Sequence, residues 1–86
     1  MTTQAIIIYV TCANTSEAET IASALVEKRL IACANILPPC AAVYRWEGKI
    51  EKGSEVAMIL KTRAAIFEDV RKAICALHSY ENAPVS

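Results

Sequence analysis

The chain has 86 residues, of which 55% are apolar and 21% charged, and its nine basic and nine acidic side chains cancel to a net charge of zero. Because no block of like charge occurs, we expect neither nucleic acid nor an anionic membrane as a partner. A chain of this length forms one domain, residues 1–86, near the size at which a core is only just large enough. So much apolar surface therefore predicts burial against further copies of the chain.

The sequence favours a cytoplasmic protein without a membrane span. Its N-terminus lacks the basic region and the small-residue cleavage site of a signal peptide, and every apolar run is far shorter than the roughly 18–20 residues of a span. The four cysteines form no CxxC pair. In a cytosolic protein we expect most of them to be small buried apolar side chains.

The first third of the chain predicts a strand followed by a helix. Residues 5–12 are rich in β-branched side chains and apolar on both alternating faces, which is typical of a central strand covered on both sides. Asn14 and Ser16 each lie three residues before a glutamate, the spacing of a capping box. Apolar residues at helical spacing follow, and the helix is expected to end near residues 29–30.

The middle of the chain predicts a long β-hairpin. Residues 31–37 favour a second strand, which two prolines at 38–39 interrupt, and strand character resumes over residues 42–46. The dipeptide Glu-Gly at 47–48 is expected to make the turn, because glycine accepts a positive φ. A hairpin this long in so small a chain cannot bury both of its faces alone, which again favours an assembly.

The return strand is expected at residues 49–51, followed by a loop or bulge at 52–54 and a further strand at 55–62. Thr62 can cap a second helix that runs from residue 63 to about residue 77. The remaining residues, from His78 onward, are too polar and too few to predict a strand.

The predicted order is thus β-α-β-β-α, an α+β protein that lacks only a final strand to match the ferredoxin-like βαββαβ arrangement. Without that strand, the first strand would offer an open apolar edge. A truncated chain, a shortened expression product and a partner chain that covers the edge are three explanations, and we favour truncation of the C-terminal strand and helix.

A search for chemistry yields few candidates, because the chain has two isolated glycines, no GxSxG motif and a single histidine. His78 follows the second helix, and one interpretation is a surface or helix-C-terminal histidine whose protonated form the helix dipole favours. The alternative is a metal centre in which His78 supplies an imidazole, Cys12 a thiolate, and Glu81 or a neighbour's carboxylate an oxygen. Thiolate and imidazole ligands suit copper or zinc.

Two aromatic side chains, Tyr44 and Trp46, lie two residues apart and therefore share one face of the predicted hairpin. We interpret them as a packing stripe between strands or at a subunit interface, with ligand stacking as the alternative. Arg45 and Glu47 fall on the opposite face, where ion pairs contribute little.

Several segments resemble the CutA family of divalent-cation tolerance proteins, and together they cover nearly the whole chain. They are residues 10–14, residues 24–38 with the run RLIACANILP, residues 44–51 (YRWEGKIE), residues 59–63 and residues 77–81. The resemblance implies a ferredoxin-like fold, a homotrimer built like the PII signalling proteins, and a link to divalent metals, copper in particular. By the same resemblance Cys12 and His78 are the ligand candidates, and no catalytic activity is implied.

The chain departs from the family pattern after its histidine. Ser79 stands where the family usually has proline. Residues 82–85 take the place of the second half of the motif, so the glutamate that the family usually has there is absent. The chain also stops about twenty residues before the family pattern ends. Glu81 remains as a substitute ligand at a different position.

The sequence therefore predicts a non-enzymatic, cytoplasmic homotrimer that binds copper or another divalent cation in metal homeostasis, with no cofactor required. The alternative is a PII-like signalling or interaction module whose response to metal ions is indirect.

Overall fold

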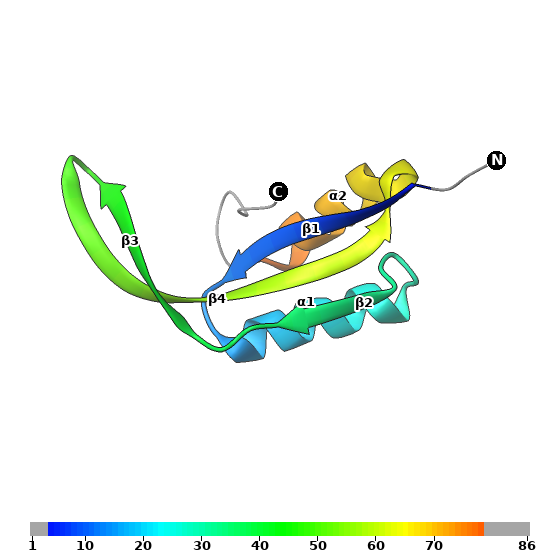
Figure 1. The fold of residues 1–86 in the computed structure, drawn as a ribbon, viewed down its shortest axis with the longest axis horizontal. Coiled ribbons are helices and arrows are strands. Elements are labelled where there is room, and N and C mark those ends of the chain that lie inside the picture. The colour runs from blue at the N-terminus through cyan, green and yellow to red at the C-terminus, as the bar shows by residue number, and fades with distance from the viewer. Residues whose placement is uncertain (1–3, 79–86) are drawn as a thin grey trace.

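The computed structural model describes residues 4–78, and its elements follow the predicted order (Figure 1). The elements are strand β1 (Ala5–Cys12), helix α1 (Thr15–Glu27), strands β2 (Cys33–Ile36), β3 (Cys40–Trp46) and β4 (Lys49–Arg63), a 3-10 turn (Ala64–Ile66) and helix α2 (Phe67–Leu77). The two prolines separate β2 from β3, as predicted. The α+β, ferredoxin-like class is thereby confirmed.

Strand β4 organises the sheet, because it pairs antiparallel with each of the other three strands. Its second half lies between β1 and β2, and its first half pairs with β3 to form an arm that projects from the body (Figure 1). This arm gives the molecule its elongated dimensions of 49 × 23 × 20 Å.

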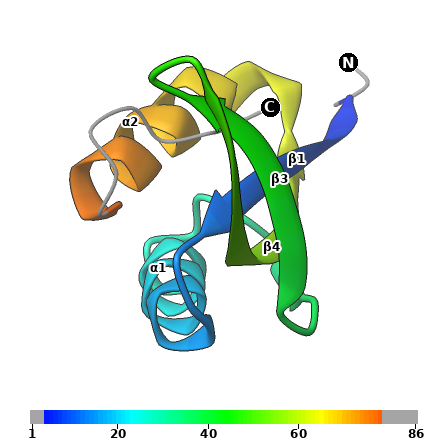
Figure 2. The same cartoon turned by 90° about the vertical axis from the view of Figure 1, so that its left-hand side faces the viewer.

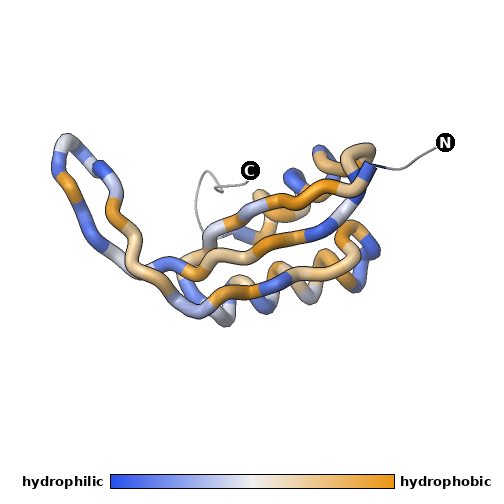
Figure 3. Tube along the Cα trace, viewed as in Figure 1, coloured by the Kyte–Doolittle hydropathy of each residue, from blue (hydrophilic) through white to orange (hydrophobic). Residues whose placement is uncertain are grey.

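The core lies between the sheet and the two helices, which sit side by side on one face of it (Figure 2). Alternate residues of β1 and β4 face the helices in register, for example Ile8 opposite Leu60 and Val10 opposite Met58. The fully buried apolar residues of the helices are Ala18, Ile21, Leu25, Val70 and Ile74. Figure 3 shows the apolar stretches of β1 and β4 running next to each other.

The prediction that β1 is covered on both faces is wrong for the described residues. Both helices pack on the same face of the sheet, so the side chain of Ile7 on the other face is 66% exposed and Tyr9 is also exposed. Within residues 4–78, β1 pairs with β4 alone, so its other edge is open among these residues, and an open edge offers unpaired backbone groups to a partner.

The hairpin turn forms at residues 47–48, as predicted from the sequence. Glu47 and Gly48 both have positive φ, 49° and 78°, as in the two-residue turns whose twist matches that of the flanking strands. The loop predicted at residues 52–54 is wrong, since β4 is continuous from Lys49 to Arg63. The reason is tertiary: residues 41–43 of β3 provide a complete set of backbone partners.

The predicted start of the second helix is also wrong. Thr62 does not cap it. Its hydroxyl instead donates a 2.6 Å hydrogen bond to the Leu30 carbonyl and so ties β4 to the end of the α1 segment. The α-helix begins at Phe67, after the 3-10 turn, without a side-chain cap. Among residues 4–78 no helix has the length and apolar character needed to cross a lipid bilayer.

Candidate metal centre

Three side chains that can bind metal ions meet where β1, α1 and α2 come together. Cys12 is the last residue of β1, Glu17 lies in the first turn of α1, and His78 directly follows α2. One ligand atom from each lies within 4.8 Å of the other two. A thiol, a carboxylate and an imidazole are thus close enough to bind a single ion.

Cys12 is completely buried. Burial, followed by the negative charge of Glu17, raises the pKa of its thiol from 9.0 to about 11, because both disfavour a thiolate. At neutral pH the thiol is protonated, and a metal ion would have to displace that proton.

Glu17 is held in place by the start of α1. Asn14 is the N-cap, and its side-chain oxygen accepts a 2.8 Å hydrogen bond from the Glu17 N–H. The Glu17 carboxylate in turn accepts a 2.9 Å bond from the Ala13 N–H. This reciprocal pattern is close to a capping box, so of the two capping pairs in the sequence the Asn14 pair is the one that begins the helix.

His78 is the C-cap residue of α2, as predicted for a helix-C-terminal histidine, but it is only 9% exposed, so it is not a surface residue. Its Nε2 lies 2.7 Å from the Thr11 carbonyl oxygen, and its own N–H closes α2 by bonding to the Ile74 carbonyl. The end of α2 therefore places the imidazole against the end of β1, beside Cys12.

The structure brings together Cys12 and His78, two of the residues that the sequence predicted as ligands, while Glu81 lies outside the described residues. Glu17 was interpreted only as a capping residue. Its capping spacing was visible in the sequence, but its proximity to His78 depends on how α2 packs. The cysteine prediction is largely wrong: of the four free thiols only Cys12 is buried, and Cys40 and Cys75 are exposed.

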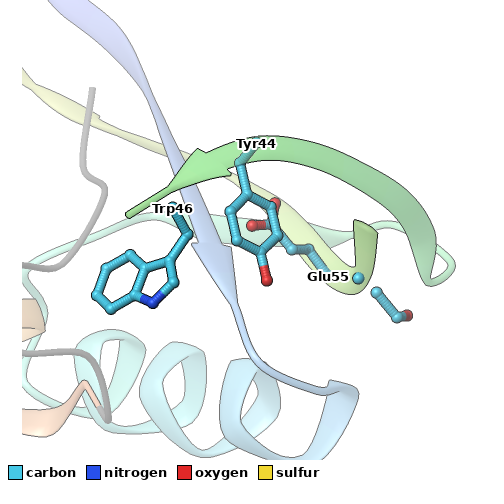
Figure 4. Close-up of a pocket in the computed structure, with 5 residues that line it drawn as sticks. Tyr44, Trp46 and Glu55 are labelled. Atoms are coloured by element: carbon cyan, nitrogen blue, oxygen red, sulfur yellow. The ribbon is translucent and has the colours of Figure 1, made fainter. Parts of the chain in front are cut away.

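A second feature is an open pocket on the hairpin arm (Figure 4). Tyr44 and Trp46 project to the same side of β3, as predicted, and line a cavity of about 440 Å³ with Gly53, Ser54 and Glu55. The Tyr44 ring lies against Gly53, where an added Cβ would be 3.5 Å from the ring. The Trp46 side chain is 63% exposed, so this aromatic surface is uncovered in the single chain.

These features define a small ferredoxin-like α+β protein with a projecting hairpin and a candidate centre for a soft divalent metal. Comparison with known families agrees: residues 6–86 match the family model described as CutA1 divalent ion tolerance protein. The chain belongs to this family.

Relatives from distant organisms support the assignment. The divalent-cation tolerance protein CutA of Archaeoglobus fulgidus is 51% identical over 73 residues, which are 85% of this chain and 71% of that protein. Protein CutA of Mus musculus is 44% identical over 77 residues, which are 90% of this chain but 44% of the mouse protein. The chain thus spans less than half the length of the mouse and human relatives.

Solved structures share the fold. The structure of the A. fulgidus protein, described there as periplasmic, superposes with a TM-score of 0.92 at 44% identity and covers 96% of this chain and 80% of that one. The CutA1 structure from Ehrlichia chaffeensis superposes with a TM-score of 0.94 at 32% identity, covering 100% of this chain and 80% of its own.

Proposed function

We propose that this protein binds a divalent metal ion, copper or an ion of similar ligand preference, through Cys12 and His78, and that it acts in metal homeostasis. The supporting observation is the meeting of a thiol, an imidazole and a carboxylate within 4.8 Å. Cys12 and Glu17 lie five residues apart across the β1–α1 junction, whereas His78 comes from the far end of the chain, directly after α2. Relatives named for divalent-cation tolerance point in the same direction.

The chemistry of the donor set favours soft or borderline ions. A thiolate and an imidazole select copper or zinc over magnesium and calcium, which prefer oxygen ligands alone. A bound ion would replace the proton of the Cys12 thiol. The attraction between the ion and the thiolate would offset the free-energy cost of burying the thiolate away from water. We propose no catalytic activity, since a thiol with a pKa of about 11 is a poor source of thiolate nucleophile at neutral pH.

We further propose that the working form is a homotrimer in the cytoplasm, with Tyr44 and Trp46 at a subunit interface. The support is exposed apolar surface in two regions, the open face of β1 with Ile7 and Tyr9 and the hairpin arm with Trp46 and Ile50. Large apolar side chains exposed in this number are typical of proteins with contact sites. The four cysteines are free thiols, which suits a reducing compartment.

The alternative function is a PII-like signalling or interaction module. The aromatic pocket on the arm favours it, because none of its lining residues belongs to the metal cluster. In that case the assembly would form and bind its partner without a metal ion, and any response to metal would be indirect.

The decisive experiment is a copper titration of the full chain by competition with a chelator of known affinity. We expect Cys12→Ser and His78→Ala each to weaken binding at least tenfold, because each removes a ligand from a shared site. Cys75→Ser is the matched control, since Cys75 is an exposed thiol outside the cluster. Unchanged affinity in both ligand variants would show that the metal site is not at Cys12 and His78.

A further inference from the structure

Another cavity, of about 540 Å³, lies at the end of the body opposite the metal centre, where β1 begins and where α1 and β4 end (Figure 1). Its lining includes three basic residues, Arg29, Lys61 and Arg63. We infer that this cavity, the basic pocket, binds a small organic oxyanion, a carboxylate or a phosphate monoester, that carries an apolar group. The basic pocket is separate from the proposed metal centre, and the inference does not depend on metal binding.

The basic pocket concentrates positive charge in a chain whose net charge is zero. It contains three of the nine basic residues, and none of the lining residues that the structure describes is acidic. None of the three basic side chains forms an ion pair or a hydrogen bond with another residue of 4–78, where the single ion pair joins Arg71 and Glu68. An anion would therefore meet three cations without an internal partner, and a cavity lined by one sign of charge attracts counter-ions.

The backbone of Arg29 provides a second, independent observation. Helix α1 ends in a Schellman motif, in which the Leu30 N–H donates to the Leu25 carbonyl and the Arg29 N–H to the Val26 carbonyl, both at 3.0 Å. Arg29 is the left-handed residue of this motif, with a φ of 60°, where glycine is the usual residue. A side chain is strained in this conformation, and such strain clusters at ligand-binding sites. The strained residue here places a guanidinium group at the basic pocket.

The segment that follows α1 is fixed against β4. The Thr62 hydroxyl donates a 2.6 Å hydrogen bond to the Leu30 carbonyl, and a 2.8 Å backbone hydrogen bond joins the same segment to Lys61. Lys61 and Arg63 are alternate residues of β4 and therefore share one face of the strand. These contacts hold Arg29 near the end of β4, so the three basic residues line one cavity without the help of a ligand.

The remainder of the lining determines the second part of the ligand. It is mainly apolar, with Val26, Leu30, Ile31 and Ile66. Val26 is 44% exposed, so an apolar group on the ligand would remove apolar surface from water. The volume falls within the roughly 300–1,000 Å³ that is usual for small-molecule sites. Guanidinium groups match the geometry of carboxylates and phosphates, which they bind through two parallel hydrogen bonds.

The first test separates the contribution of charge from that of apolar surface. The full chain, labelled with 15N, is titrated with octanoate, octyl phosphate, inorganic phosphate or the neutral octan-1-ol, and 1H–15N correlation spectra are recorded. We expect saturable shifts at the amides of residues 29–32 and 61–63 with octanoate, octyl phosphate or both. Inorganic phosphate should bind at least about tenfold more weakly, because it lacks the apolar group, and octan-1-ol should give no saturable shift.

The pattern of binding identifies the oxyanion. Shifts with octanoate alone would indicate a carboxylate ligand, shifts with octyl phosphate alone would indicate a phosphate monoester, and shifts with both would indicate recognition of the oxyanion itself; each result supports the inference. Octan-1-ol that binds as tightly as the anions would show that charge has no role. Inorganic phosphate that binds as tightly as octyl phosphate would show that the apolar wall has none. Either result, or no saturable shift with either organic anion, would overturn the inference.

The second test uses substitutions of the basic residues. Glycine suits the left-handed position better than arginine, so Arg29→Gly should raise the midpoint temperature of thermal unfolding. Its affinity for the probe that binds should nevertheless fall at least about tenfold, because a charged hydrogen-bond donor is lost. Arg63→Gln should weaken binding similarly, while Arg45→Gln, the same change on β3 outside the pocket, should leave it unchanged.

The rise in unfolding temperature excludes loss of the fold as the cause of weaker binding by Arg29→Gly. An Arg29→Gly variant that binds the probe like the unchanged chain would show that Arg29 only ends the helix, and the inference would fail. Equal losses of affinity in Arg45→Gln and Arg63→Gln would place the binding in the overall charge of the chain rather than in the basic pocket, and would also overturn it.

Discussion

Cys12 combines two properties that oppose each other. It is completely buried among apolar side chains, which keeps its thiol protonated, yet it lies beside a carboxylate and an imidazole. Without a cation, the carboxylate adds to the desolvation and raises the pKa of the thiol further. The site is therefore most compatible with a neutral thiol when empty and with a thiolate when a metal ion is bound.

This raised pKa predicts how stability depends on pH. The Cys12 thiol ionises at pKa 9.0 in the unfolded chain and at about 11 in the folded chain, so above pH 9 the unfolded state loses the proton first. The free energy of unfolding should be fully retained below pH 9 and should fall by about 2–3 kcal/mol as the pH rises to 11. Urea unfolding of the metal-free protein across this range measures the loss.

The control for this pH series is Cys12→Ala, which removes the titrating thiol while leaving the lysines and tyrosines in place. As the pH rises from 9 to 11, the free energy of unfolding of the unchanged chain should fall by more than that of Cys12→Ala. Parallel curves for the two proteins would show that the buried thiol does not titrate abnormally.

Among the elements, the hairpin shows how a local signal and a tertiary one combine. The turn at Glu47 and Gly48 is fixed by local chemistry, since both residues have positive φ. The continuity of β4 through Gly53 is fixed by pairing with β3. Glutamate is poorly suited to a left-handed conformation, so the turn carries a strain that its sequence does not relieve.

That strain predicts a stabilising substitution. Asparagine tolerates positive φ and is favoured before glycine in two-residue hairpin turns. Glu47→Asn should therefore raise the free energy of unfolding by about 0.5–1 kcal/mol. Glu51→Asn, in the regular part of β4, is the control and should be neutral or destabilising. Equal effects at the two positions would indicate that charge, rather than turn geometry, is responsible.

At the scale of the whole molecule, the main feature that a single chain leaves unexplained is its exposed apolar surface. In the described part of the chain, helices cover only one face of the sheet (Figure 2), and the hairpin arm extends beyond the body (Figure 1). A single chain therefore leaves Ile7, Val43, Trp46 and Ile50 more than half exposed. Association with other copies is the simplest way to remove this surface from water.

The proposed trimer can be tested at the aromatic pair on the arm. The double variant Tyr44→Ala/Trp46→Ala should dissociate at concentrations at least tenfold higher than those at which the unchanged protein does, because large aromatic side chains often dominate binding energy at interfaces. Val26→Ala is the control, since Val26 on α1 is 44% exposed, close to the 47% of Tyr44.

Native mass spectrometry over a dilution series gives the subunit number and the dissociation range together. A trimer of the unchanged chain that persists equally in the double variant would place the interface elsewhere. A monomer at micromolar concentration would contradict the assembly itself.

Much of this protein was predictable from local patterns alone. The order of elements, the capped start of α1, the proline break and the Glu-Gly turn all follow from short-range chemistry, because caps, turns and periodicity involve residues only a few positions apart. Cys12 and His78 were identifiable through a family resemblance and through the scarcity of other ligands.

Tertiary packing decided the rest. Whether residues 52–54 formed a loop depended on the partner strand, and whether Thr62 capped a helix depended on the Leu30 carbonyl, 32 residues away. Glu17 looked like a capping residue because the sequence does not show that the end of α2 reaches the first turn of α1. The approach of His78 to within 4.8 Å of Cys12 and Glu17 exists only after the core has brought the end of α2 to the end of β1, since no short-range rule connects residue 78 with residues 12 and 17.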